Sequence, residues 1–269
     1  MTMAELHGKI KPYEMLEDLL TSDVFCAFRY CDPNDGLIPF LQKAICFEDL
    51  KRTPNFLHDI KSAHYHFWPK SKSLREPDLI IVIERTDGST AAINIEAKYQ
   101  SGKHNHETEE DTFELNHLSG DQLFAQYQLL EEKSYSGNLG KELAHAEEFY
   151  LFYITAHYVP PDNDIEETKG VANKHNKGPA IGNFFWLNWA AAWKICDVFK
   201  DEGHRSYLIL RDLFELLERK NLTELSLWKE DMNQTYRTIP WFWDESLSFW
   251  QDLPYASVDL GESIFWNIE

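Results

Sequence analysis

Apolar residues recur with a helical period near the start of the chain. Within residues 13–30 they are spaced three or four positions apart, at Tyr13, Leu16, Leu20, Val24, Ala27 and Phe28. This spacing places them on one face of a helix. A second helix is predicted over residues 37–49. The run "AHYHFW" at residues 63–68 then predicts a first strand, which Pro69 ends.

Residues 75–103 contain two apolar runs around the turn sequence Thr-Asp-Gly-Ser at residues 86–89. Short apolar runs on both sides of such a turn predict a β-hairpin, which supplies the second and third strands. Each run has an acidic residue at its outer end, Asp78 in the first and Glu96 in the second. The hairpin therefore brings two carboxylates toward the same end of the sheet.

The remainder of the chain alternates between the two element types. A helix is predicted over residues 121–133 and an apolar, aromatic strand over residues 147–159. Residues 160–182 are rich in Pro, Asn, Gly and Lys, which predicts a long loop that could be functional. A further strand at "FFWLNW" and helices over residues 190–200 and 206–219 complete a mostly helical C-terminal part.

The length of the hairpin turn decides whether the two acids meet. With a three-residue turn centred on Asp87, the numbers of paired residues add up to 174 and Asp78 lies opposite Glu96. Their Cβ atoms would then be roughly 4.5–5.5 Å apart. With a two-residue turn, Asp78 would lie opposite Ala97 instead. Strand alternation also places Glu96 and Lys98 on the same face.

Two carboxylates at this distance repel each other, so one pKa should rise unless a cation lies between them. Mg²⁺ is a hard ion that binds one or two carboxylates together with substrate phosphate and water. The neighbouring Lys98 ammonium could position or polarise a water molecule, or stabilise a developing negative charge. These residue types in this arrangement favour phosphodiester hydrolysis.

The sequence "PD" at residues 77–78, followed by "EAK" at residues 96–98, resembles the motif of the PD-(D/E)XK nuclease superfamily. The resemblance implies an α/β fold with a restriction-endonuclease-like core, in which helices flank a mixed central sheet in the order α-β-β-β-α-β, over residues 12–156. It also implies that Asp78 and Glu96 bind Mg²⁺, or Mn²⁺ in its place. Ala97 would contribute its backbone carbonyl to the metal, and Lys98 would assist the attacking water.

Many members of this superfamily add a metal-associated glutamate from the first helix, and Glu14 and Glu17 are the two candidates here. On a helical wheel Glu17 lies about 60° from the middle of the apolar stripe and Glu14 about 120° away. A glutamate at the border of a buried face can reach inward toward a site. We therefore expect Glu17 to be the fourth catalytic and metal-binding residue, with an ordinary surface acid as the alternative.

Two further residues are expected to contact substrate. One branch of the superfamily, the recombination-repair exonucleases, has Gln and Tyr four residues apart on the helix after the lysine strand. This chain departs from that pattern, because Gln126 stands at the tyrosine position and Tyr127 follows it. Gln122 is expected to contact the scissile phosphate or the site carboxylates. Lys103 is expected to contact a phosphate of the substrate.

Other basic and metal-ligand residues were weighed against simpler roles. His104 and His106 form a His-x-His pair without an apparent third ligand, so we interpret them as exposed loop residues. The segment at residues 169–178 carries three lysines, which either clamp a nucleic-acid strand or are solvated in a loop. The four cysteines have no C-x-x-C spacing and are expected to be reduced, structural thiols.

The length of 269 residues and the 43% hydrophobic content allow a large core. We assign residues 1–220 to the nuclease-like core and residues 221–269 to a C-terminal extension that packs on it. That extension is rich in tryptophan, with Trp228, Trp241, Trp243, Trp250 and Trp266. Because acidic residues surround these side chains and would repel phosphates, packing is expected rather than base stacking.

The formal net charge of -19 is unusual for a protein that binds a polyanion. Residues 51–103 depart from this average, with nine Lys and Arg against six Asp and Glu. No stretch approaches the length of a membrane span, and the N-terminal residues lack the pattern of a signal peptide. We therefore expect a soluble, cytoplasmic protein that does not bind membranes.

The combined hypothesis is a Mg²⁺-dependent nuclease that acts on DNA rather than RNA, in phage defence, restriction or repair. Its alternative is a catalytically inactive module that keeps the nuclease fold and acts through protein partners, which the negative charge favours. A homodimer or a partner protein is expected from the family resemblance alone. The sequence leaves open endonuclease versus exonuclease action, strandedness and target sequence.

Overall fold

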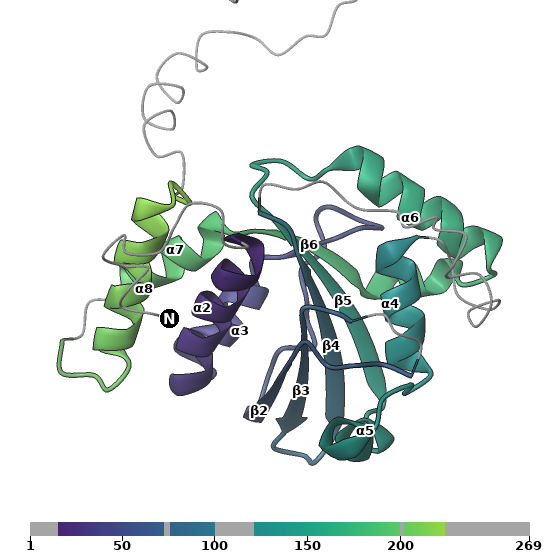
Figure 1. Cartoon of the computed structure of the whole chain (residues 1–269), viewed down its shortest axis with the longest axis horizontal. Coiled ribbons are helices and arrows are strands. Elements are labelled where there is room, and N and C mark those ends of the chain that lie inside the picture. The colour runs from purple at the N-terminus through teal and green to yellow at the C-terminus, as the bar shows by residue number, and fades with distance from the viewer. Residues whose placement is uncertain (1–15, 73–75, 100–120, 200–201, 224–269) are drawn as a thin grey trace, which may run out of the picture. The chain divides into compact units, whose positions relative to one another are not determined.

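The computed structural model describes residues 16–72, 76–99, 121–199 and 202–223, all of which belong to the compact unit of residues 1–224. The fold is α/β, with a mixed six-stranded sheet flanked by helices (Figure 1). The strands are β1 (Ile45–Cys46), β2 (Ile60–Phe67), β3 (Leu79–Arg85), β4 (Thr90–Ala97), β5 (Glu148–Thr155) and β6 (Phe184–Asn188). The helices are α2 (Leu16–Tyr30), α3 (Leu37–Leu41), α4 (Gln122–Glu131), α5 (Gly137–Ala144), α6 (Asp162–Lys174), the 3₁₀ helix η2 (Gly178–Asn183), α7 (Ala190–Val198) and α8 (Tyr207–Arg219).

The sheet has the strand order β1-β6-β5-β4-β3-β2. Strands β2, β3 and β4 form an antiparallel meander, whereas β4, β5 and β6 are parallel and β1 is antiparallel to β6. The predicted succession of one helix, three strands, one helix and one strand is present as α2, β2, β3, β4, α4 and β5, with α3 and β1 inserted after α2 and α5 inserted after α4. None of the described helices combines the length and apolar character that crossing a bilayer requires.

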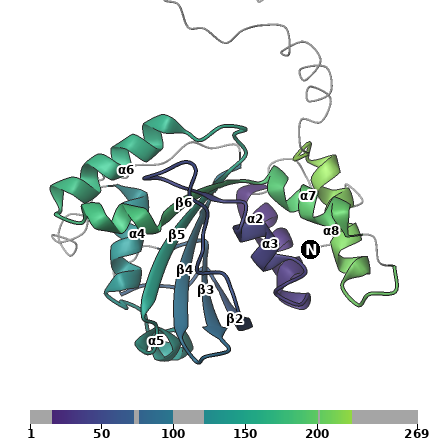
Figure 2. The ribbon, with the colours of Figure 1, turned by 180° about the vertical axis from the view of Figure 1, so that it is seen from behind.

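Helices cover both faces of the sheet, as the two opposite views show (Figures 1 and 2). On one face α2, α3, α7 and α8 pack on the alternate strand residues that include Ile81, Ile93 and Phe152. On the other face α4, α5 and α6 pack on residues of opposite parity, such as Ile80 and Leu151. Because successive strand residues point to opposite faces, Glu96 shares the face that α4 covers.

The connection between β3 and β4 is the three-residue turn on which the pairing of the acids depends. Leu79 pairs with Ile95, and Glu84 with Thr90, so the paired numbers add up to the predicted 174. Gly88 has a φ of +87°, a conformation that residues with a Cβ atom avoid. The Asp87 carboxylate accepts hydrogen bonds from the amide and hydroxyl of Ser89. The predicted register is therefore confirmed.

Two predictions about the secondary structure are wrong. The helix expected over residues 37–49 ends at Leu41, because Ile45 and Cys46 instead form β1 and pair with β6. The long loop expected over residues 160–182 contains α6, which buries Ile165 and Ala172. Prolines at the very start of this segment are compatible with a helix that begins after them.

The sequence analysis also missed one helix, and part of its prediction lies outside the described residues. Helix α5 was not expected, because its two glycines weaken the helical pattern. The predicted C-terminal extension, with its tryptophans, begins at residue 221, and the described residues end at 223. The four cysteines are free thiols.

Candidate active site

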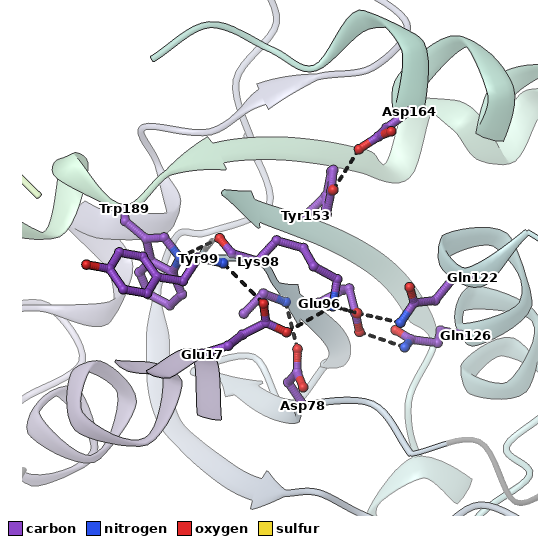
Figure 3. Close-up of polar contacts among 11 residues, drawn as sticks. Glu17, Asp78, Glu96, Lys98, Tyr99, Gln122, Gln126, Tyr153, Asp164 and Trp189 are labelled. Atoms are coloured by element: carbon purple, nitrogen blue, oxygen red, sulfur yellow. Dashed lines mark hydrogen bonds and ion pairs between the residues drawn. The ribbon is translucent and has the colours of Figure 1, made fainter. Parts of the chain in front are cut away.

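The start of β3 and the end of β4 meet at one edge of the sheet, where Asp78 and Glu96 lie close together (Figure 3). Asp78 precedes β3 directly, and its Oδ2 accepts a hydrogen bond of 2.8 Å from the backbone amide of Ala97. This bond links the two strand ends. It holds the Asp78 carboxylate beside the last residues of β4.

Glu96 is 1% exposed and its carboxylate accepts three hydrogen bonds. Gln122 Nε2 donates to Oε1 at 2.6 Å, and Lys98 Nζ lies 2.7 Å from the same oxygen. Gln126 Nε2 donates to Oε2 at 2.6 Å. A buried carboxylate needs such partners, because it has lost its hydration.

Lys98 joins the strand site to the first helix. Its Nζ lies 3.0 Å from Oε1 of Glu17, and the amide of Tyr99 donates to the other Glu17 oxygen at 3.2 Å. The Lys98 backbone is fixed as well, because its amide donates to the Ile154 carbonyl and its carbonyl accepts from the Trp189 indole. The Lys98 ammonium is therefore held between two carboxylates by a rigid strand end (Figure 3).

Burial and neighbouring charges together raise the pKa values of Asp78, Glu96 and Lys98. Burial, and then the charge of Glu96, raises the pKa of Asp78 well above its usual value. Burial also raises the pKa of Glu96, although the charge of Lys98 opposes this change. Burial alone would lower the pKa of Lys98, but the charge and hydrogen bond of Glu96, with the charges of Glu17 and Asp78, raise it. Lys98 is therefore an ammonium at neutral pH.

The donor set suits a divalent cation in chemistry, although Glu17 and Glu96 pair with Lys98. Glu17, Asp78 and Glu96 supply three carboxylates against one ammonium, so the fully ionised cluster carries two excess negative charges. Oxygen ligands of this kind are those that Mg²⁺ prefers. Within the described ranges, no group of three or more His, Cys, Asp or Glu side chains is arranged to hold a metal ion. The ion pairs of Lys98 with Glu17 and Glu96 account for this arrangement.

Tyr153 lies beside Glu96 on the neighbouring strand β5. Its hydroxyl donates to Oδ2 of Asp164 on α6 at 2.8 Å. Burial, followed by the hydrogen bond to Asp164, raises the pKa of Tyr153. The phenol is therefore neutral at physiological pH and does not act as a base.

The structure brings Glu17, Asp78, Glu96 and Lys98 together, as the sequence analysis expected. Of the two contacts considered for Gln122, the structure contains the one to a site carboxylate. Ala97 lies at the site, and its backbone amide donates a hydrogen bond to the Asp78 carboxylate.

Other sequence candidates are placed elsewhere or lie outside the described residues. Glu14, Lys103, His104 and His106 are among the residues that the structure does not describe. Two of the three lysines expected in a loop lie on α6 instead, and Lys169 there pairs with Glu166. Lys177 follows the helix and pairs with Glu131.

Gln126 is a site residue that the sequence analysis did not select. Its signal was available, because Gln126 follows Gln122 by four positions and therefore lies on the same face of α4.

No protein-family model matches the chain, and comparisons with curated proteins and with solved structures give no match either. The chemistry of the site is therefore inferred from its side chains.

Proposed function

We propose that the protein is a Mg²⁺-dependent nuclease of the PD-(D/E)XK type, which hydrolyses phosphodiester bonds of DNA on a restriction-endonuclease-like core. One observation carries this proposal: Asp78 and Glu96 meet at one sheet edge together with the ammonium of Lys98. Glu17 reaches the same point from α2. The helix and strand order around these residues supports the proposal as well.

In this proposal Asp78, Glu96 and Glu17 would hold the ion, which supplies charge neutralisation and an activated water when bound. Water attacks phosphorus and gives up one proton to solvent, the bond from phosphorus to the leaving oxygen breaks, and the leaving oxygen takes up a proton from solvent. The raised pKa of Lys98 makes it a hydrogen-bond donor and not a base. Lys98 therefore orients the water or stabilises the negative charge that develops on the phosphate oxygens.

The proposal requires Lys98 to loosen its contact with at least one carboxylate. Its ammonium lies within 3.0 Å of both Glu17 and Glu96, so a divalent ion and Lys98 would compete for the same two carboxylates. With a divalent ion bound to these carboxylates, the Lys98 ammonium would be available for water or phosphate. The apo site is thus held together by the group that later takes part in hydrolysis.

The test is a cleavage assay with the full chain on linear and circular duplex DNA, single-stranded DNA and RNA, in Mg²⁺ or Mn²⁺. We expect cleavage of DNA that EDTA abolishes and excess Mg²⁺ restores. Lys98→Met keeps most of the packing volume but removes the charge, and it should lower the turnover rate roughly 100-fold or more.

The matched control is Lys61→Met. Lys61 on β2 also pairs with a glutamate, Glu84, but this pair is exposed and lies near the end of β3 that is far from Asp78. This variant should cleave at the wild-type rate. Absence of cleavage of every substrate by folded wild-type protein would overturn the proposal, as would full activity of Lys98→Met.

The second candidate is a catalytically inactive module that acts through protein partners. The observation that favours it is the pairing of Lys98 with both Glu17 and Glu96, which satisfies these carboxylates without a metal. Calorimetric titration with Mg²⁺ and Mn²⁺ separates the candidates. The nuclease binds the ions at this site, and Asp78→Asn weakens the binding, whereas the module binds neither ion.

A further inference from the structure

Helix α4 directs two amides at one buried carboxylate. Gln122 and Gln126 are one helical turn apart, and each donates to a different oxygen of Glu96 at 2.6 Å (Figure 3). Gln126 is 2% exposed. The start of the helix is fixed by Asp121, whose carboxylate accepts a hydrogen bond from the amide of Phe124.

The orientation of both amides follows from the chemistry of their partner. An ionised carboxylate only accepts hydrogen bonds, so each glutamine must present its NH₂ group to Glu96. The carbonyl oxygens Oε1 of Gln122 and Gln126 are consequently buried without a hydrogen-bond partner. An unpaired buried acceptor costs free energy, and at residue 126 this cost is offset by the hydrogen bond that the amide donates to Glu96. The observed glutamine therefore indicates a role beyond packing.

The hydrogen bonds leave the Glu96 carboxylate with one acceptor lone pair that is not occupied. Each carboxylate oxygen has two in-plane lone pairs, and Oε1 uses both of them, for Gln122 and Lys98. Oε2 accepts the single bond from Gln126. The lone pair that stays available is thus on Oε2, and the bond from Gln126 fixes its direction.

We propose that Gln126 is a positioning residue, which holds the Glu96 carboxylate so that Oε2 is free to bind the divalent ion. The inference rests on the proposed function. Groups that hydrogen-bond a metal ligand from behind set its orientation, and their loss typically weakens metal affinity or activity by roughly 10- to 100-fold. Gln126 would therefore act through Glu96 and never touch the substrate.

The experiment compares wild type with Gln126→Leu in calorimetric titrations with Mn²⁺ and in cleavage kinetics at increasing Mg²⁺. We expect the affinity of the variant for the ion to fall roughly 10- to 100-fold. The kcat at low Mg²⁺ should fall in parallel and recover as Mg²⁺ increases, while the KM for DNA stays unchanged. A purely structural role would lower the folded fraction, but the folded molecules would then bind the ion with the wild-type affinity.

Two more variants sharpen the test. Gln128→Leu makes the same change two residues further along α4, on a side chain that does not contact Glu96, and it should bind the ion like wild type. Gln126→Asn keeps an amide but shortens its reach, so its affinity for the ion should be intermediate. This variant replaces Gln126→Leu in the test if Gln126→Leu does not fold.

The outcomes separate the two levels of the proposal. If wild type binds the ion and cleaves DNA while the folded Gln126 variants match it in affinity and kcat, the role of Gln126 is overturned and the nuclease stands. If folded wild type neither binds the ion nor cleaves, the proposed function is overturned, and the role of Gln126 with it.

Discussion

The Asp78 carboxylate accepts the Ala97 amide hydrogen bond and also lies close to the charge of Glu96. Burial and this charge raise its pKa in the folded state above the value in the unfolded chain. The folded protein therefore binds the proton more tightly than the unfolded chain does. It follows that the contribution of Asp78 to stability is greatest at low pH and is lost as the pH rises through the folded-state pKa.

Because the folded-state pKa of Asp78 is raised, we predict that Asp78→Asn stabilises the metal-free protein at neutral pH. Asparagine removes the charge but keeps an oxygen that accepts the Ala97 amide. The gain in the free energy of unfolding should be on the order of 1 kcal/mol at pH 7–8, since each pKa unit corresponds to about 1.4 kcal/mol. Urea unfolding in EDTA between pH 4 and pH 8 measures it, and the gain should shrink toward pH 4.

Asp87→Asn is a control variant whose stability at neutral pH should change in the opposite direction. Hydrogen bonds from Ser89 lower the pKa of Asp87, so its contribution to stability is present at neutral pH and is lost as the pH falls. This variant should be less stable than wild type at pH 7–8. A loss of stability in both variants at pH 8 would contradict the charge repulsion that we infer between Asp78 and Glu96.

The proximity of Asp78, Glu96 and Lys98 could be predicted from the sequence because it depends on local rules. Strand alternation and the length of one turn were sufficient to define it. The spacing from Gln122 indicates which face of α4 carries Gln126, but the partners of Gln126 and Tyr153 depend on how α4 and α6 dock on the sheet. Such docking is not encoded in a short segment, so these partners could not be predicted in the same way.

At the scale of elements, the β3–β4 turn is the feature that sets the register of the site. Gly88 closes this turn with a φ of +87°, and a Cβ atom at this position would have nothing within 4 Å. Any cost of a substitution there is consequently a cost of backbone conformation and not of a clash. Gly170 on α6 has equally open surroundings without a positive φ.

We therefore expect Gly88→Ala and Gly170→Ala to change stability in opposite directions. Alanine in a left-handed conformation costs about 1–2 kcal/mol, whereas alanine within a helix gains up to about 1 kcal/mol over glycine. Urea unfolding at neutral pH measures both values. A similar loss in the two variants would show that the conformation of Gly88 is not what stabilises the turn.

The missed helix α6 shows how packing can override a sequence pattern. Residues 160–182 are rich in Pro, Asn, Gly and Lys and predict a loop, yet Ile165 and Ala172 bury an apolar face against α4 and η2. Tertiary packing stabilises this helix more than its propensity does. The α-β-β-β-α-β succession was easier to predict because each of its elements carries a strong apolar pattern.

At the scale of the whole molecule, the net charge of -19 opposes the binding of a polyanion. Three carboxylates in the site add to this repulsion locally, and Lys98 offsets part of it. A divalent ion bound between the carboxylates and a phosphate would reverse the sign of the interaction. Binding of nucleic acid should accordingly depend on the ion even where no cleavage follows.

The Lys98→Met variant tests this expectation, because it should bind DNA without cleaving it. We expect gel-shift titrations to give an affinity at least about tenfold higher in Ca²⁺ than in EDTA, which corresponds to about 1.4 kcal/mol. Equal and tight binding in both conditions would indicate a basic surface that binds DNA independently of the ion.

The site residues come from segments that are distant in the sequence: the bond between Lys98 and Glu17 spans 81 positions, and that between Gln126 and Glu96 spans 30. During synthesis the ribosome releases the first helix long before α4 exists. An incomplete polypeptide, or a fragment left by a protease, consequently lacks the assembled chemistry. If the protein cuts DNA as proposed, the order in which the chain is built would protect the genome of the cell that makes it from premature cleavage.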